Sequence, residues 1–267
     1  MDTAVTPDAG ASDVLLYEAN GPVATLRLNR PRQSNAFDPA LRAAMRERVA
    51  AIEADPAIRI CVVTGEGRNF CAGADLGNGG PDLPVSEHLD REYGPFLRTM
   101  SEGSTIWIAA VNGAAAGIGA AVAMNCDLVV MEESAFVYMA FAAISLIPDG
   151  GNTWLLLNRM GYHRAFEAVA EGQRIAAEDC LAHGIANRVV GPGEALGEAQ
   201  GWAESLAARA PLSLAAAKRL LRRVGHGTYS EAITTEGAEQ DGLIASADHK
   251  EGVRAFFEKR APEWRGE

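Results

Sequence analysis

The chain has 267 residues, of which 48% are hydrophobic and 22% are charged. This composition is typical of a globular protein of one or two domains with a large core. The net charge of -11 argues against nucleic acid as a partner, because neutralising phosphates needs a basic face. The one dense basic cluster consists of Lys218, Arg219, Arg222 and Arg223, and we interpret it as the solvated face of a helix.

The apolar stretches are too short for a membrane span. No uninterrupted run reaches the roughly 18 residues that a spanning helix needs, because Asn112 and nearby glycines interrupt the longest one. Residues 1–12 lack the basic and apolar regions of a signal peptide and are expected to be a flexible tail. The cysteines at positions 61, 71, 126 and 180 show neither paired spacing nor a metal-ligand pattern with the histidines. We therefore expect a cytoplasmic protein with reduced thiols, no metal and no membrane contact.

A hairpin and a helix are predicted near the start of the chain. Residues 14–18 and 23–29 are candidate strands joined by the turn signal Asn-Gly-Pro at residues 20–22, and the second strand alternates apolar and polar side chains. Asp38 followed by Pro39 marks a helix start, with aspartate as the N-cap and proline at the first helical position. The apolar stripe of that helix is Leu41, Met45, Val49 and Ile52.

A continuous apolar run at residues 58–64 predicts a buried strand. The Gly-x-Gly that follows suggests a dinucleotide-binding loop, but Phe70 occupies the position of the third glycine, so we reject that interpretation. Residues 77–84 are rich in glycine and proline and predict a loop. A helix is expected over residues 86–102.

The centre of the chain contains the stretch around which we expect the fold to be organised. Residues 106–111 and 128–131 predict buried strands, and residues 114–124 carry no charge, so a helix there is enclosed on all sides. The first N–H groups of a helix lack intrahelical partners, and Gly117 and Gly119 keep side chains away from a ligand that approaches them. The alternative is that these small residues only permit close helix packing.

The second half of the chain is mostly helical. Residues 135–139 predict a short strand, residues 141–147 form an apolar segment that ends at Pro-Asp-Gly-Gly, and residues 185–190 predict a last strand. Helices are expected over residues 152–160, 162–170, 176–183, 195–209, 212–224, 229–246 and 249–260. No linker-like composition separates the strand-rich half from the helical half.

Five segments resemble the enoyl-CoA hydratase/isomerase, or crotonase, family and occur in the order seen there. They are LNRPRQSNAF (28–37), VVTGEGRNFCAGADL (62–76), VNGAAAGIGAAVAMNCDLVV (111–130), IPDGGNTWLLLNRMG (147–161) and SADHKEGVRAFFEKRAPEW (246–264). The resemblance implies an α/β fold, a crotonase-like spiral of strand-strand-helix repeats over residues 13–195, followed by a helical region at residues 196–267 for trimerisation and the CoA site. It also implies an acyl-CoA thioester substrate, no separate cofactor, and assembly as a homotrimer or a dimer of trimers.

The resemblance implies two backbone N–H groups that hold the thioester oxygen and stabilise an enolate. By motif position these donors are Ala74, in Ala-Gly-Ala-Asp-Leu, and Ile118, at the start of the buried helix. The side chain of Asp75 is expected to cap a helix. Phe256 and Lys259, one turn apart in the last helix, are expected to reach the CoA of a neighbouring subunit. The full set expected to bind substrate is Arg32, Ala72, Ala74, Asp75, Leu76, Gly77, Ile118, Phe256 and Lys259.

The chain departs from the hydratase pattern at two positions. Hydratases of the family carry one glutamate where this chain has Ala121 and a second at or near the position of Phe141, and adding water needs a positioned acid or base. Asp149 instead resembles the single carboxylate with which isomerases of the family move a proton between carbons α and γ of the thioester, although Pro-Asp-Gly is also an ordinary turn sequence. The prediction is an enoyl-CoA isomerase with Asp149 as proton shuttle. The alternatives are a hydratase with an unconventional acid or base, and a non-catalytic acyl-CoA-binding protein.

Three further acidic residues are assigned no chemical role. Asp127, at the edge of an apolar strand, is predicted to be a buried, hydrogen-bonded structural residue. Glu132 and Glu133 are predicted to lie in an exposed turn.

Overall fold

The structure is a computed structural model that describes residues 14–78, 83–225 and 227–267. The expected flexible tail at residues 1–12 lies outside the described residues. The predicted hairpin is present as β1 (Leu15–Asn20) and β2 (Val23–Leu28), which pair antiparallel.

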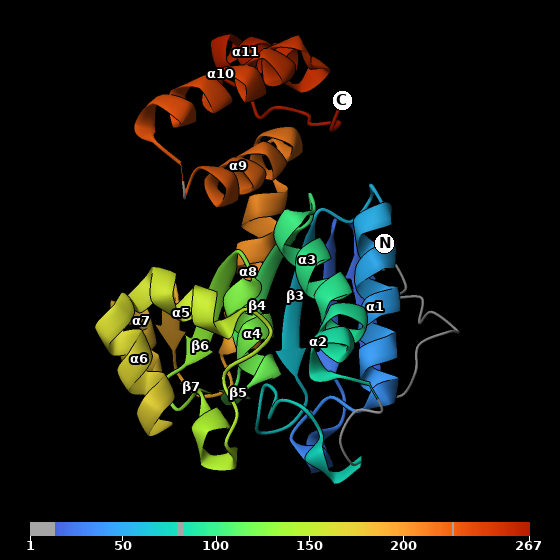
Figure 1. The fold of residues 1–267 in the computed structure, drawn as a ribbon. Coiled ribbons are helices and arrows are strands. Elements are labelled where there is room, and N and C mark those ends of the chain that lie inside the picture. Colours follow the sequence, from blue (N-terminus) through green and yellow to red (C-terminus); the bar gives the residue numbers. More distant parts are fainter. Residues whose placement is uncertain (1–13, 79–82, 226) are drawn as a thin grey trace.

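A six-stranded sheet forms the centre of the molecule (Figure 1). Its strand order is β1-β2-β3-β4-β6-β9, and every pair after the first is parallel. The added strands are β3 (Ile60–Gly65), β4 (Ile106–Val111), β6 (Leu128–Glu132) and β9 (Arg188–Val190).

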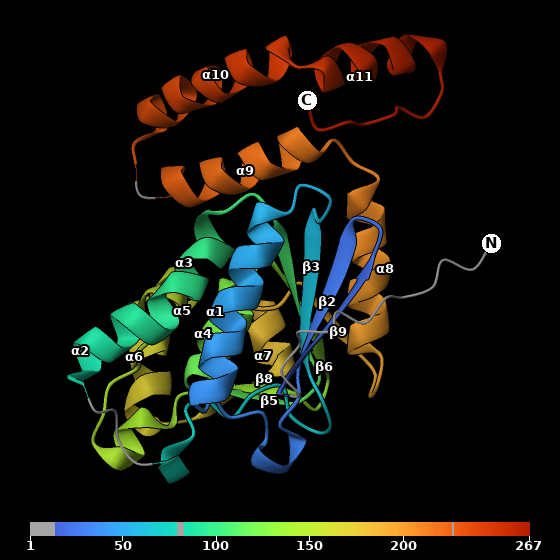
Figure 2. The same cartoon turned by 90° about the vertical axis from the view of Figure 1, so that its right-hand side faces the viewer.

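Both faces of this sheet are buried. Along β3, Cys61 and Val63 pack into one hydrophobic cluster, whereas Ile60 and Val62 pack into another. This explains why β3 has a continuous apolar sequence and not an alternating one. Figure 2 shows α8 covering one face and α1, α3 and α4 lying on the other. These helices are α1 (Pro39–Ala54), α3 (Gly94–Glu102), α4 (Ile118–Asn125) and α8 (Ala195–Ala207).

A small second sheet gives the chain its spiral course. β5 (Ala114–Ala116) pairs parallel with β7 (Phe136–Tyr138), and β7 pairs antiparallel with β8 (Arg174–Ala176). The chain passes from β4 in the large sheet to β5 in the small sheet and then into α4. It repeats this course from β6 to β7 before the next helices, which is the strand-strand-helix pattern that the resemblance implies.

Several local predictions differ from the structure. Residues 114–116 were expected to be helical but form β5, because they pair with β7 and the chain turns at Gly117 before α4 begins. The helix expected over residues 86–102 is divided into α2 (Val85–His88), a π-helical turn (Leu89–Tyr93) and α3. Glu132 is buried at the end of β6, so only Glu133 is exposed as predicted. The remaining helices lie close to their expected positions: α5 (Asn152–Met160), α6 (Tyr162–Glu171), α7 (Ala177–Ala182), α9 (Pro211–Val224), α10 (Tyr229–Ala245) and α11 (Ala247–Glu258).

Two cations of the basic cluster attach α9 to the core. Lys218 is only 6% exposed, and its ammonium group donates to the carbonyls of Met100 and Thr105 at 2.6 and 2.7 Å. Lys218 and Arg222 also pair with the carboxylate of Asp127 at 3.0 and 3.1 Å. The prediction of a solvated face is therefore wrong for these two residues, whereas the structural role of Asp127 is confirmed.

α10 and α11 lie beyond α9, at the end of the molecule opposite β5 (Figures 1 and 2). The C-terminal segment returns from α11 toward the junction of α8 and α9, where the indole N–H of Trp264 donates to the carbonyl of Ala208 at 3.0 Å. This contact ties the end of the chain to the rest of the structure.

All four cysteines are buried and unpaired. Within residues 14–78, 83–225 and 227–267, no group of three or more His, Cys, Asp and Glu side chains is arranged to hold a metal ion. None of the helices in these residues has the length and apolar character that crossing a membrane requires.

Candidate active site

The loop after β3 lies directly against the segment that leads into α4. The N–H of Cys71 donates to the carbonyl of Ala114 at 3.0 Å, and the N–H of Ala116 donates back to Cys71 at 2.8 Å. Gly73 has a φ of +99°, and a Cβ atom there would lie 3.0 Å from the Ala116 oxygen. Glycine is therefore required at this position both for the backbone conformation and for the close approach.

The N–H of Ala74 is directed toward this neighbouring segment. Phe37 donates its N–H to the carbonyl of Gly73 at 2.7 Å and accepts from the N–H of Asp75 at 3.1 Å. A trans peptide points its C=O and N–H to opposite sides, so the N–H of Ala74 points away from Phe37 and toward residues 114–118. It donates to no acceptor in the part of the chain that the structure describes.

The N–H of Ile118 is oriented by the same principle. The carbonyl of Gly117 accepts from the N–H of Ala121 at 3.1 Å and from Nδ2 of Asn152 at 2.9 Å. The N–H of Ile118 therefore points away from the body of α4, and no acceptor for it occurs among the described residues. Since a Cβ on Gly73 would lie 3.6 Å from the Cα of Gly117, the two N–H groups belong to segments that are in contact.

Asn152 was not predicted as a site residue. It is the first residue of α5 and is fully buried, and its amide holds the peptide that carries the N–H of Ile118. Its partner is 35 positions away in the sequence, so no local pattern reveals the contact. The only sequence signal nearby is the Pro-Asp-Gly-Gly that precedes it.

Asp149 lies next to the first turn of α4. A Cβ atom on the adjacent Gly150 would lie 2.4 Å from Cδ1 of Ile118 and 3.0 Å from Cβ of Ala121, so this loop packs tightly on the helix. Oδ1 of Asp149 is buried and has no hydrogen-bond partner among the described residues. Burial raises the pKa of Asp149, against a smaller opposing effect of its own backbone N–H. A carboxylate in this environment is suited to accept a proton.

Ala121 and Phe141, where the resemblance to hydratases implies glutamates, both carry apolar side chains. Ala121 is fully buried in α4. The ring of Phe141 lies over Gly117, with Cζ 3.6 Å from the position that a Cβ on Gly117 would take. Neither residue offers an acid or a base for activating water.

Arg30, also not predicted, anchors the loop that carries Ala74. Its guanidinium lies 3.0 Å from Oδ2 of Asp75 and 3.2 Å from Oδ2 of Asp38, and this contact lowers the pKa of Asp75. Oδ1 of Asp75 accepts from the N–H of Gly77 at 3.0 Å, which is the local capping role expected from the sequence. Asp75 therefore fixes the loop and does not extend into the region near Asp149.

The other predicted binding residues fall into two groups. Ala72, Leu76 and Gly77 are exposed on the same loop as Ala74. Arg32 is exposed in the 3₁₀ turn Pro31–Gln33, which directly follows Arg30 in the chain.

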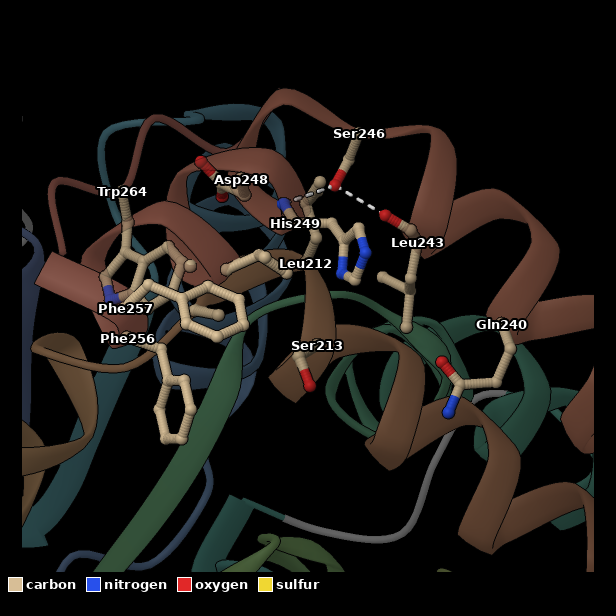
Figure 3. Close-up of a pocket in the computed structure, with 13 residues that line it drawn as sticks. Leu212, Ser213, Gln240, Leu243, Ser246, Asp248, His249, Phe256, Phe257 and Trp264 are labelled. Carbon is tan, nitrogen blue, oxygen red and sulfur yellow. Dashed lines mark hydrogen bonds between the residues drawn. The ribbon is translucent and has the colours of Figure 1, made fainter.

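Phe256 and Lys259 do not reach this site within one chain. Phe256 is 79% exposed in α11, at the opposite end of the molecule. With Phe257 and Trp264 it lines an apolar pocket between α9, α10, α11 and the C-terminal segment (Figure 3). Lys259 follows the end of α11 in a left-handed conformation, with φ 55°. The helix ends at Glu258, so Lys259 lies just beyond α11 and not within it as predicted, although its N–H still donates to the carbonyl of Phe256 one turn earlier, at 3.3 Å.

Comparison with known proteins defines the class. A profile of the family described as enoyl-CoA hydratase/isomerase matches residues 18–267, and the chain belongs to this family. The crystal structure of an enoyl-CoA hydratase from Bacillus anthracis has a TM-score of 0.90 at 29% identity, covering 95% of this chain and 100% of that chain. The predicted fold is confirmed.

Individual relatives have different names within this class. The 1,2-epoxyphenylacetyl-CoA isomerase of Escherichia coli strain K12 is 35% identical over 261 residues, which is 95% of this chain and 99% of the relative. A probable enoyl-CoA hydratase of Rhodobacter capsulatus is 35% identical over 252 residues, covering 94% and 97% of the two chains. Family membership therefore establishes an enoyl-CoA hydratase/isomerase-type enzyme, and the site must be used to choose between reactions.

Proposed function

We propose that this protein isomerises an enoyl-CoA by moving its double bond, with Asp149 as the only proton carrier. The thioester oxygen accepts hydrogen bonds from the N–H groups of Ala74 and Ile118, which stabilise the enolate as charge develops. Asp149 removes a proton from carbon α of a 3-enoyl-CoA and returns it to carbon γ, so the carboxylate is regenerated and no water is consumed. The observation that carries the proposal is the buried oxygen of Asp149, which has no hydrogen-bond partner among the described residues and lies beside α4.

The residues of the site favour this reaction over the alternatives. Ala121 and Phe141 place a methyl group and a ring where hydration needs carboxylates. A protein that only binds acyl-CoA has no need for a carboxylate oxygen that is buried away from water, as Oδ1 of Asp149 is. The partly buried position of Asp149 and its raised pKa support an enzyme.

The variant Asp149→Asn tests the proposal, because the amide keeps the shape of the side chain and cannot accept the proton. Isomerisation should fall about a hundredfold to ten-thousandfold, as is typical for loss of a general base, with acyl-CoA affinity nearly unchanged. Asp179→Asn serves as a matched control, because Asp179 is exposed on α7. Equal rates for the two variants would refute the assignment of Asp149.

We further propose that the complete CoA site is shared between subunits of a trimer. Phe256 and Lys259 are exposed at the end of α11, and α11 lies at the far end of the molecule from β5 and α4, so their contact with CoA requires a second copy. Lys259, with Arg32, supplies positive charge to an acidic protein that binds a polyanion. Full activity of a monomer, measured by light scattering at the assay concentration, would contradict the shared site.

A further inference from the structure

Tyr93 occupies an unusual backbone position close to the proposed site. It ends the π-helical turn Leu89–Tyr93, which interrupts the helical segment between α2 and α3. Single π-helical turns inside helices are rare and frequently occur at functional sites. The side chain is only 3% exposed and packs edge-on against Phe37 and Phe96, with ring centroids 5.9 and 6.1 Å apart.

The ring of Tyr93 carries a buried hydroxyl group into the neighbourhood of Asp149. Leu97 lies one helical turn further along, and its Cδ1 would be 3.7 Å from a Cβ atom on Gly150. Residues four apart share a helix face, so Tyr93 faces the same side as the loop of Asp149. Burial raises the pKa of Tyr93. The guanidinium of Arg42, 5.8 Å from the centre of the ring, opposes this effect by its charge and as a donor toward the phenol oxygen, and the nearby carboxylate of Asp149 adds to the effect of burial. Because a guanidinium can only donate, Arg42 offers the O–H of Tyr93 no acceptor.

Two buried oxygen atoms at this place have no hydrogen-bond partner among the described residues: Oη of Tyr93 and Oδ1 of Asp149. They do not bond to each other. The guanidinium of Arg42 is directed to Glu92 and to the carbonyl of Phe37, at 3.3 and 3.4 Å. Buried hydroxyl groups in proteins nearly always find a partner, because leaving one unpaired is costly.

A hydrocarbon acyl chain gives the Tyr93 hydroxyl group no acceptor. A site with a buried donor discriminates strongly against a ligand that leaves the donor unpaired. We propose that the acyl group taken by this site carries an oxygen atom, as a hydroxyl, carbonyl or epoxide group, close to the carbons that Asp149 serves, and that Tyr93 donates a hydrogen bond to it. This inference rests on the proposed function, because it assumes that an acyl-CoA binds beside Asp149. Tyr93 is then a specificity-determining residue, separate from the proton carrier.

The test compares two matched substrates: a 3-enoyl-CoA with a hydroxyl group on its fifth carbon, and the analogue with a methyl group there. The wild type should prefer the hydroxyl substrate in kcat/KM by roughly tenfold to a hundredfold. Tyr93→Phe should abolish this preference by losing rate on the hydroxyl substrate alone. Tyr162→Phe, which alters an exposed tyrosine on α6, should retain the preference.

Equal rates of the wild type on both substrates would overturn the inference. An equal loss of rate on both substrates in Tyr93→Phe would also overturn it, because the Tyr93 hydroxyl would then hydrogen-bond Asp149 or an ordered water and not the substrate. A wild type that isomerises neither substrate would instead refute the proposed function. Calorimetric binding of the saturated hydroxyl and methyl acyl-CoA pair would still decide the role of Tyr93. Tighter binding of the hydroxyl compound by the wild type, lost in Tyr93→Phe, supports the inference, and equal binding overturns it.

Discussion

Asn152 is expected to affect the catalytic rate indirectly, by orienting the peptide bond between Gly117 and Ile118. Its Nδ2 donates to the carbonyl of Gly117, and the N–H on the other side of that peptide is the proposed donor of Ile118. In Asn152→Ala the carbonyl of Gly117 still accepts from the N–H of Ala121 at 3.1 Å, so the peptide is held less firmly but keeps its orientation. Complete loss of an oxyanion donor lowers kcat by about 100-fold to 1000-fold, and we expect a smaller decrease here.

The expected loss is roughly tenfold in kcat, or about 1.4 kcal/mol of transition-state stabilisation, with little change in KM. The free energy of unfolding should change by only about 1 kcal/mol. Alanine removes the hydrogen bond to Gly117, but it also removes Oδ1 of Asn152, which is buried without a partner among the described residues. Asn152→Asp, which places an acceptor against the Gly117 carbonyl, should lower kcat further than alanine does.

Steady-state kinetics on a 3-enoyl-CoA would measure these effects. Asn158→Ala is the matched control, since Asn158 is exposed on the same helix and its side chain donates to the carbonyl of Trp154 at 2.8 Å. If Asn152→Ala loses no more activity than Asn158→Ala while both variants fold, the orienting role of Asn152 is refuted.

Three further predictions concern buried charges. Lys218→Met should lower the free energy of unfolding by about 3 kcal/mol in urea titrations. It leaves the Asp127 carboxylate with Arg222 and the N–H of Trp107, and it removes the donor of two carbonyls. A loss no larger than that of the exposed Arg223→Ala would contradict this. The raised pKa of Asp149 means that activity should increase as pH rises through a midpoint above the ordinary carboxyl value. The ionised form also costs stability above the unfolded-state pKa, so Asp149→Asn should be more stable than the wild type at neutral pH, with the difference vanishing in acid. A pH-independent difference in melting temperature would contradict this reasoning.

Features that depend on local sequence were predictable. Asp38 accepts from the N–H of Leu41 at 2.8 Å and Pro39 begins α1, as the capping pattern indicated. The Asn-Gly-Pro turn joins β1 to β2 as expected. Caps and turns act within a few residues, so their signals lie in adjacent positions.

Features that depend on distant partners were not predictable. β5 consists of three alanines with no strand preference of their own, and it exists because it pairs with β7. Lys218 is buried because the carboxylate of Asp127 and two carbonyls compensate its charge, and all three lie about a hundred residues away. The approach of Leu97 in α3 to the Gly150 loop, and with it the influence of Asp149 on Tyr93, likewise arises only in the folded chain.

The most direct test of the central claim is to incubate the wild-type protein separately with a 3-enoyl-CoA and a 2-enoyl-CoA and to identify the products by mass spectrometry and chromatography. A one-carboxylate isomerase should convert the 3-enoyl-CoA to the 2-enoyl-CoA at unchanged mass and add water slowly or not at all. Rapid gain of one water by the 2-enoyl-CoA, unaffected by Asp149→Asn, would contradict the account and show that another residue activates water.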